Sequence, residues 1–140
     1  MKTDINNMMK VAVVSIACAA VLLFAACKST AKTNGLVAEY RYGMSAGDSS
    51  GYTFYRFYNN STFTRGAYGK TGSKTGEIVM EHGTYIGNAD ANGTITLTVT
   101  STLNALNGEW LSSNSSDMEN GTISSNMFIF NGITYTKYNK

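Results

Sequence analysis

The stretch TITLTVT, residues 94–100, alternates aliphatic side chains with threonines along its whole length. Successive side chains of a strand point to opposite faces, so this spacing predicts a β-strand with one buried and one solvated face. A second stretch, FIFNGITYT at residues 128–136, contains Asn131-Gly132, the strongest short signal for a two-residue hairpin turn. We expect these two stretches to contribute one packed set: Phe128, Phe130, Ile133, Tyr135, Ile95, Leu97 and Val99.

Similar short runs of β-branched and aromatic residues recur outward from these stretches, separated by clusters of Gly, Asn, Asp and Ser. No helical period is visible from Leu36 onward. We expect strands at residues 36–43, 52–59, 62–68, 77–86, 94–101, 107–112, 122–130 and 133–138. Seven or eight strands in roughly 105 residues predict an all-β domain, either an antiparallel sandwich or a small barrel.

The strand expected at residues 52–59 carries aromatic residues on both faces. One face holds Tyr52, Phe54, Arg56 and Tyr58, and the other holds Thr53, Tyr55 and Phe57. Because Arg56 is charged, we expect the second face to be interior. The first face would then be an exposed aromatic stripe that meets a macromolecular partner or another copy of the chain. In the alternative, the loop at residues 107–121 folds over the stripe and buries it.

The first 26 residues read as an export signal. Two lysines, Lys2 and Lys10, precede an apolar run of 16 residues from Val11 to Ala26. A charged start, an apolar stretch and small residues at its end are typical of a secretory signal peptide. The run is short for a membrane-spanning helix, which needs about 20 apolar residues. An uncleaved membrane helix is the alternative.

The four residues Phe24-Ala25-Ala26-Cys27 resemble the lipobox of bacterial lipoproteins, although Phe24 stands where that motif usually has Leu. The resemblance implies cleavage before Cys27 and a covalent lipid on its thiol, with no other cofactor. It also implies a bacterial protein anchored to the outer membrane or cell surface, and Lys28 fits outer-membrane sorting. The expected organisation is a signal peptide at 1–26, a lipidated Cys and flexible tether at 27–35, and a barrel domain at 36–140.

Composition excludes several classes of protein. The 140 residues carry 11 Lys and Arg against 9 Asp and Glu, a formal charge of +2, which does not suit a nucleic-acid binder. After cleavage Cys27 is the only cysteine, so an intrachain disulfide or a zinc finger is excluded.

A short repeat, GAYG at residues 66–69 and GTYIG at residues 83–87, places Gly-x-Tyr after two of the expected strands. Glycine within a strand can mark a tight bend or a close approach of backbones. With the order of strands and turns over residues 52–138, this pattern resembles small lipocalin-like bacterial lipoproteins. The resemblance implies a closed up-and-down barrel of about eight strands. It also implies an alternative function, carriage of a small apolar ligand in a barrel mouth lined by Tyr55, Phe57, Phe128, Phe130 and Tyr135.

Catalytic and metal motifs are poorly supported. Gly43-Met44-Ser45-Ala46-Gly47 matches G-x-S-x-G, but the fold that uses this motif needs a following helix, and a surface loop is expected here. His82 is the only histidine and is expected to be an ordinary strand residue. Asn88, Asp90 and Asn92 have the spacing of a calcium loop, but Val99 stands where a bidentate Glu is required. We therefore expect a non-catalytic, metal-free binding domain.

Overall fold

Nine strands make up the computed structural model over the residues that it describes, 35–47, 49–113 and 117–139. The strands are β1 (Leu36–Ala46), β2 (Ser49–Tyr58), β3 (Thr62–Thr71), β4 (Lys74–Ile86), β5 (Gly93–Leu103), β6 (Trp110–Ser112), β7 (Met118–Ser124), β8 (Met127–Phe130) and β9 (Ile133–Lys137). No helix occurs among these residues. The all-β prediction is therefore confirmed.

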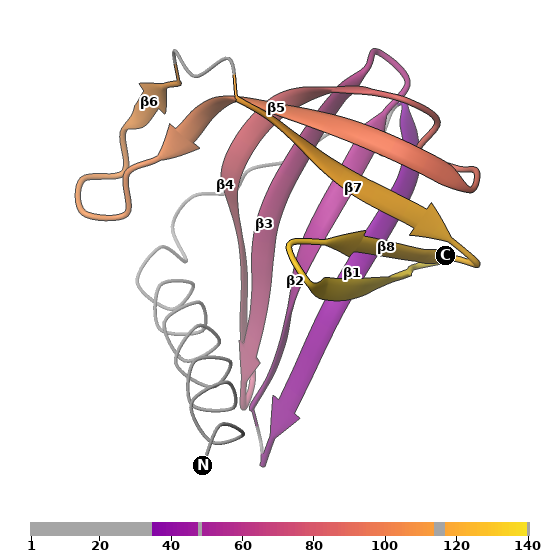
Figure 1. Cartoon of the computed structure of the whole chain (residues 1–140). Helices are drawn as coiled ribbons and strands as arrows, with labels where there is room; N and C mark the ends of the chain where they lie inside the picture. The colour runs from indigo at the N-terminus through magenta and orange to yellow at the C-terminus, as the bar shows by residue number, and fades with distance from the viewer. Residues whose placement is uncertain (1–34, 48, 114–116, 140) are drawn as a thin grey trace, which may run out of the picture.

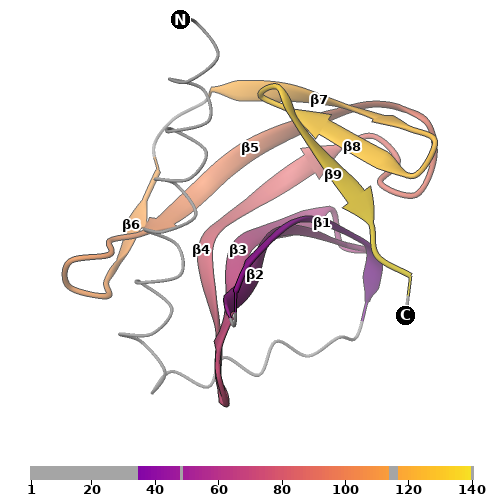
Figure 2. The ribbon, with the colours of Figure 1, turned by 90° about the horizontal axis from the view of Figure 1, so that it is seen from below.

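Eight of the strands close into an antiparallel barrel (Figures 1 and 2). Each strand pairs with its neighbour in the chain, except that β5 pairs with β7, and β1 closes the barrel against β9. The remaining strand, β6, pairs with the end of β5 and lies outside the barrel. The barrel, and not the sandwich, is the architecture of this chain.

Two-residue turns set the register of the last three strands. Asn131 and Gly132 both have positive φ, 48° and 75°, and Phe128 lies opposite Tyr135 as predicted. The single strand expected at 122–130 is wrong, because the chain turns at Ser125 and Asn126, whose φ values are 49° and 66°. Positive φ at both turn positions matches the twist of the flanking strands, so a second tight hairpin forms there.

The first four strands are longer than the sequence pattern predicts and extend beyond the barrel (Figure 1). Residues 44–46, beyond the strand expected at 36–43, continue β1 and pair with β2, and Ser45 lies opposite Ser50. Lys70 and Thr71 likewise belong to β3, and the turn lies at Gly72 and Ser73. Backbone pairing across these hairpins overrides the polar composition that suggested loops.

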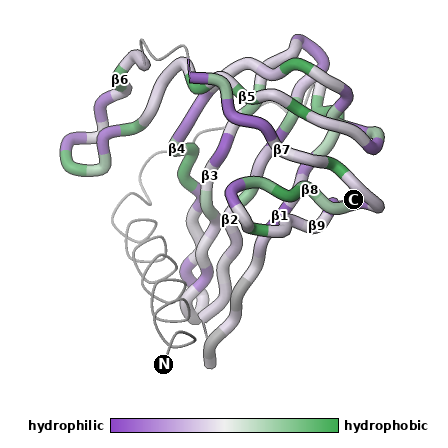
Figure 3. Tube along the Cα trace, viewed as in Figure 1, coloured by the Kyte–Doolittle hydropathy of each residue, from purple (hydrophilic) through white to green (hydrophobic). Residues whose placement is uncertain are grey.

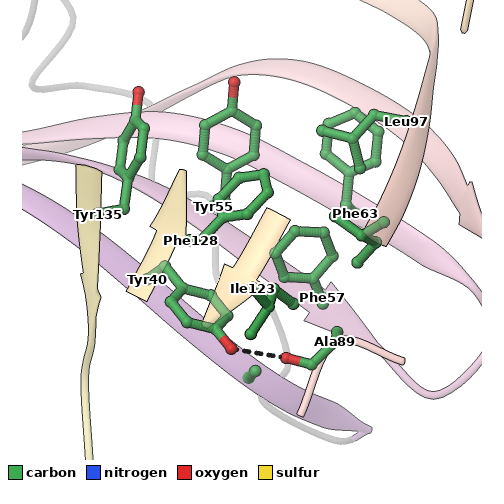
Figure 4. Packing of buried hydrophobic residues seen from close by; sticks show 11 residues of the cluster. Tyr40, Tyr55, Phe57, Phe63, Ala89, Leu97, Ile123, Phe128 and Tyr135 are labelled. Atoms are coloured by element: carbon green, nitrogen blue, oxygen red, sulfur yellow. Dashed lines mark hydrogen bonds between the residues drawn. The ribbon is translucent and has the colours of Figure 1, made fainter. Parts of the chain in front are cut away.

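Aromatic rings fill the barrel (Figure 4). Tyr55 and Phe57 from β2 meet Phe128 from β8 edge to face, with ring centroids 5.2 and 5.6 Å apart. The predicted packing set is confirmed for Phe128, Tyr135, Ile95 and Leu97, which belong to the buried cluster, and for Val99 and Phe130, which pack against it. Ile133 is the exception, with 37% of its surface exposed beyond the Asn-Gly turn.

Two glycines make room for the rings at β-bulges. Phe63 lies against Gly83, where an added Cβ would come within 2.4 Å of its Cε1 atom. Gly66 leaves the same space for the ring of Phe54 on the outer face of the sheet. A Cβ added at Gly66 would lie 2.4 Å from the Phe54 Cζ atom. The Gly-x-Tyr repeat thus marks close approach, as predicted.

One end of the barrel is plugged by the loop between β4 and β5. Ala89 of this loop is buried in the core cluster, and its carbonyl accepts a 2.8 Å hydrogen bond from the Tyr40 hydroxyl. An ion pair between Asp90 and Lys137 ties the loop to the end of β9. The hydroxyls of Tyr55 and Tyr135 point the other way, towards the opposite end (Figure 4).

Candidate functional site

The outer face of β2 carries the stripe singled out in the sequence. Tyr52, Arg56 and Tyr58 are partly buried, whereas Phe54 is 0% exposed. The expectation that Phe54 is exposed is therefore wrong. The Phe54 ring lies against Gly66, in the space that a side chain there would fill. The Arg56 guanidinium covers the other side of the ring, 4.0 Å from its centroid.

Four charged side chains form a continuous network across this face. Glu39, only 6% exposed, accepts hydrogen bonds from Arg41 Nε at 2.5 Å and from Arg56 Nε at 2.9 Å. The other side of Arg56 binds both carboxylate oxygens of Glu77, at 2.6 and 2.9 Å. A bidentate pairing of this kind fixes the orientation of the guanidinium as well as its position. The order across the sheet is Arg41, Glu39, Arg56, Glu77.

Tyrosine rings continue the network on both sides of Arg41. Its guanidinium carbon lies 4.3 Å from the centroid of Tyr52 and 3.3 Å from that of Tyr138. Tyr52 also stacks on Tyr68 of β3, with centroids 4.9 Å apart. Burial raises the pKa of Tyr52 above its usual value, and the charge of Arg41 partly opposes this shift. The partly exposed rings are therefore held in fixed positions by their neighbours.

The loop at residues 107–121 does not supply the burial of Phe54 in the part that the structure describes. Residues 110–112 pair with the end of β5, and the Trp110 ring packs against His82 with centroids 4.4 Å apart. Burial lowers the pKa of His82 below its usual value, which favours the neutral imidazole. The cover over Phe54 comes from Arg56 and from Tyr52, whose ring centroid lies 6.3 Å from that of Phe54.

A small cavity of about 120 Å³ lies at the open end of the barrel. Its wall includes the rings of Tyr55 and Phe130 and the ion pair between Arg65 and Glu81, whose atoms are 2.7 Å apart. Glu119 lines the same space and accepts a 2.9 Å hydrogen bond from Asn131 at the β8–β9 turn. Half of the residues that line this mouth have charged or amide side chains and half are apolar or aromatic, so it is not the purely apolar mouth expected from the sequence.

Burial raises the pKa of Tyr55 well above its usual value, and the charge of Arg65 only partly opposes the shift. The pKa of Tyr135 is raised for the same reason. Of the five residues expected to line a ligand site, only Tyr55 and Phe130 line the cavity; Phe57 and Phe128 are 0% exposed in the core. The sequence did not identify Arg65, Glu81 and Glu119 as residues that line the cavity, because nothing in the strand pattern indicates that these charged side chains face inward.

The three residues of the candidate calcium loop hydrogen-bond or ion-pair with other groups of the protein. Asn88 Oδ1 accepts the Asp90 backbone N–H at 2.9 Å, Asn92 Oδ1 accepts that of Ser125 at 3.0 Å, and Asp90 pairs with Lys137. Among the described residues, no three His, Cys, Asp or Glu side chains gather as a metal site would need. Cys27, the export signal and the tether up to residue 34 lie outside the described residues.

Comparison with known proteins adds no relative. No family model, no curated protein and no solved structure matches the chain. Within the described residues, no helix is both long enough and apolar enough to span a bilayer.

Proposed function

We propose that this chain is a lipid-anchored, non-catalytic binding module of the bacterial cell envelope, related to lipocalin-like lipoproteins. The lipobox-like sequence at Phe24–Cys27 supports a lipid on Cys27, and Lys28 supports the outer membrane or cell surface as its destination. Neither a cofactor nor a nucleic acid is part of the proposal. The partner is a protein that docks on the outer face of β1 and β2.

The filled barrel is the observation that carries this proposal. Ligand pockets for small molecules usually measure about 300–1,000 Å³, and the mouth offers about 120 Å³. The core cluster occupies the rest of the interior. Recognition of anything larger than a few atoms must therefore use the outside of the barrel.

The outer face has the chemistry of a protein interface. Tyr52 and Tyr58 are partly exposed, and tyrosine and arginine are the residues enriched at the centres of protein interfaces. Tyr52 is fixed between Arg41 and Tyr68 before any partner arrives. A side chain that is already ordered loses little entropy on binding, which favours affinity.

Site-specific photo-crosslinking in living cells tests the docking face. A photoreactive residue at position 52 or 58 should give one discrete protein adduct, and the same residue at position 134, on the outer side of β9, should give none. The adduct from position 58 should disappear when Tyr52→Ala is added. A uniform smear from all three positions, or no adduct at 52 and 58, would refute the interface. An adduct of twice the chain mass would identify the partner as a second copy.

Anchoring is tested separately. Cys27→Ala should abolish labelling by radioactive palmitate and release the protein from the detergent phase, because the thiol is the proposed site of the lipid. Membrane association that persists without the label would point to the uncleaved apolar helix instead.

A second candidate, carriage of a small ligand in the mouth, is favoured by the cavity beside Tyr55 and Arg65. Its size and its three carboxylates restrict the ligand to a few heavy atoms and to polar chemistry. Phe130→Ala would enlarge the cavity. Small polar compounds can be screened for one that raises the melting temperature of the wild-type chain. A compound that does so, but has no effect on Arg65→Met, would support ligand carriage in the mouth.

A further inference from the structure

A hairpin with exposed apolar side chains projects from the barrel between β5 and β6 (Figure 1). We call residues 103–111 the apolar hairpin. Leu106 at its tip is 96% exposed, and Leu111 and Trp110 are 53% and 43% exposed. Figure 3 shows its apolar residues as green segments away from the core. Single exposed apolar residues are ordinary, but a group on one projecting element marks a contact surface.

Four backbone N–H groups of the hairpin tip donate to acceptors within the hairpin. The N–H groups of Asn104 and Gly108 donate to the carbonyls of Glu109 and Asn104, both at 2.8 Å. Side-chain oxygens of Asn104 and Asn107 accept from the N–H groups of Leu106 and Glu109, at 3.0 and 3.1 Å. The amide of Asn107 donates in turn to the Glu109 carboxylate at 2.8 Å. Polar backbone groups with internal partners cost little to move out of water.

The charge around the hairpin excludes an electrostatic contact with an anionic surface. No Lys or Arg occurs between Lys74 and Lys137. The hairpin itself carries only Glu109, and Asp117 follows it in the chain. A contact made here is therefore apolar, with tryptophan and leucine as its main groups. Tryptophan is the side chain that best suits the boundary between lipid and water, because its ring is apolar and its N–H is polar.

The chain that precedes the barrel brings a bilayer within reach. The apolar run ends at Ala26, the proposed lipid is on Cys27, and β1 begins at Leu36. Nine residues span at most about 30 Å, so a lipid on Cys27 would hold the start of β1 within that distance of the membrane. A short tether also gives the hairpin a high effective concentration at the bilayer, so a weak affinity is enough.

We infer that the apolar hairpin inserts shallowly into the lipid interface of the membrane that anchors the chain, with Leu106 and Trp110 as the inserted side chains. This inference rests on the proposed anchoring. Shallow insertion leaves Glu109 in the hydrated headgroup layer and places the barrel in one orientation on the membrane. The contact is apolar, so added salt does not weaken it.

The only tryptophan of the chain, Trp110, reports on this contact directly. The full acylated chain is reconstituted into phosphatidylcholine vesicles whose acyl chains carry bromine, which quenches tryptophan within van der Waals range. Trp110 emission should be quenched in brominated vesicles and shielded from acrylamide in water. Leu106→Asn should lower the partition of the hairpin at least about tenfold, since a leucine is removed from the apolar phase. Ile86→Asn, at the end of β4 where the side chain is 71% exposed, should change nothing.

Two outcomes overturn the inference. In an acylated chain that floats with the vesicles, Trp110 emission unaffected by bromine shows that the lipid anchors the protein without the hairpin. Equal loss of quenching in Leu106→Asn and Ile86→Asn shows that the contact is not local to the hairpin. Mass spectrometry of the same sample reports acylation independently. A chain without acyl groups refutes the proposed anchor, and bromine quenching in that chain still supports the hairpin contact.

Discussion

The two faces of β2 carry aromatic side chains of similar size but bury them by different means. On the inner face, Tyr55 and Phe57 are surrounded by rings from five other strands. On the outer face, Phe54 is equally inaccessible to water, yet it lies between a glycine below and a guanidinium above. The inner face is an ordinary aromatic core. On the outer face, a single layer of side chains covers Phe54, and ion pairs hold that layer in place.

Among the described residues, neither a second sheet nor a helix lies over Phe54, so the strand buries this outward phenylalanine with side chains of its own sheet. Arginine covers the ring with its planar group while its charge is neutralised by carboxylates at the edge. Glu39 and Glu77 hold Arg56 in that position. The neighbouring tyrosines become ordered at the same time, which is the property that the proposed interface requires.

The largest effect should come from truncating the two phenylalanines of β2. Phe57→Ala leaves a cavity enclosed by rigid rings and should cost about 3–5 kcal/mol of unfolding free energy. Phe54→Ala should cost less, about 2–3 kcal/mol, because Arg56 can move into the space. Urea denaturation of both variants measures the comparison. Equal losses would show that the outer layer is as rigid as the core.

Gly66→Ala tests the close approach beneath Phe54. The added Cβ would lie 2.3 Å from the Ile78 carbonyl oxygen and 2.4 Å from Phe54 Cζ, so the strand must shift. We expect a loss of about 1–3 kcal/mol, and a smaller further loss when Phe54→Ala is added. Gly43→Ala is the matched control, since its nearest neighbour is at 3.7 Å. A tolerated Gly66→Ala would contradict the packing described.

Alkaline pH should destabilise the fold through Tyr55 of the inner face. Burial raises the pKa of Tyr55 above the usual value of 10.0, so the folded state keeps a proton that the unfolded state releases. The stability from this tyrosine is complete below pH 10 and is lost as pH rises above it. Urea midpoints should fall from about pH 9 to about pH 11, and less steeply in Tyr55→Phe. An unchanged slope in that variant would remove Tyr55 as the cause.

The smallest effect should come from the partly exposed end of the outer network. Glu77→Gln removes the charge that faces Arg56 and should cost about 0.5–1 kcal/mol, because Glu77 is still in contact with water. The loss should shrink at high salt. Glu109→Gln, on the exposed hairpin tip, is the control and should leave the melting temperature unchanged. A much larger loss in Glu77→Gln would mean that the network supports the barrel itself.

The sequence by itself determined most of the strands, the inner faces at residues 52–58 and 94–100, and the last hairpin. Strict alternation at residues 94–100 and Asn131-Gly132 are local signals, and they act through the period of the strand and the φ angles of two residues. Arg56 likewise marked the outer side of β2, which placed Tyr55 and Phe57 correctly inside. Such features need no knowledge of distant residues, because each strand carries its own pattern.

Only the tertiary structure decided what covers each side chain. Phe54 is buried because Gly66, twelve residues away, and the network around Glu39 meet on the same face. The charged mouth arises because Arg65 and Glu81 come together across β3 and β4. The interior is filled because rings from strands remote in sequence point to one axis. Burial is a property of neighbours in space, and pairing of distant strands sets those neighbours.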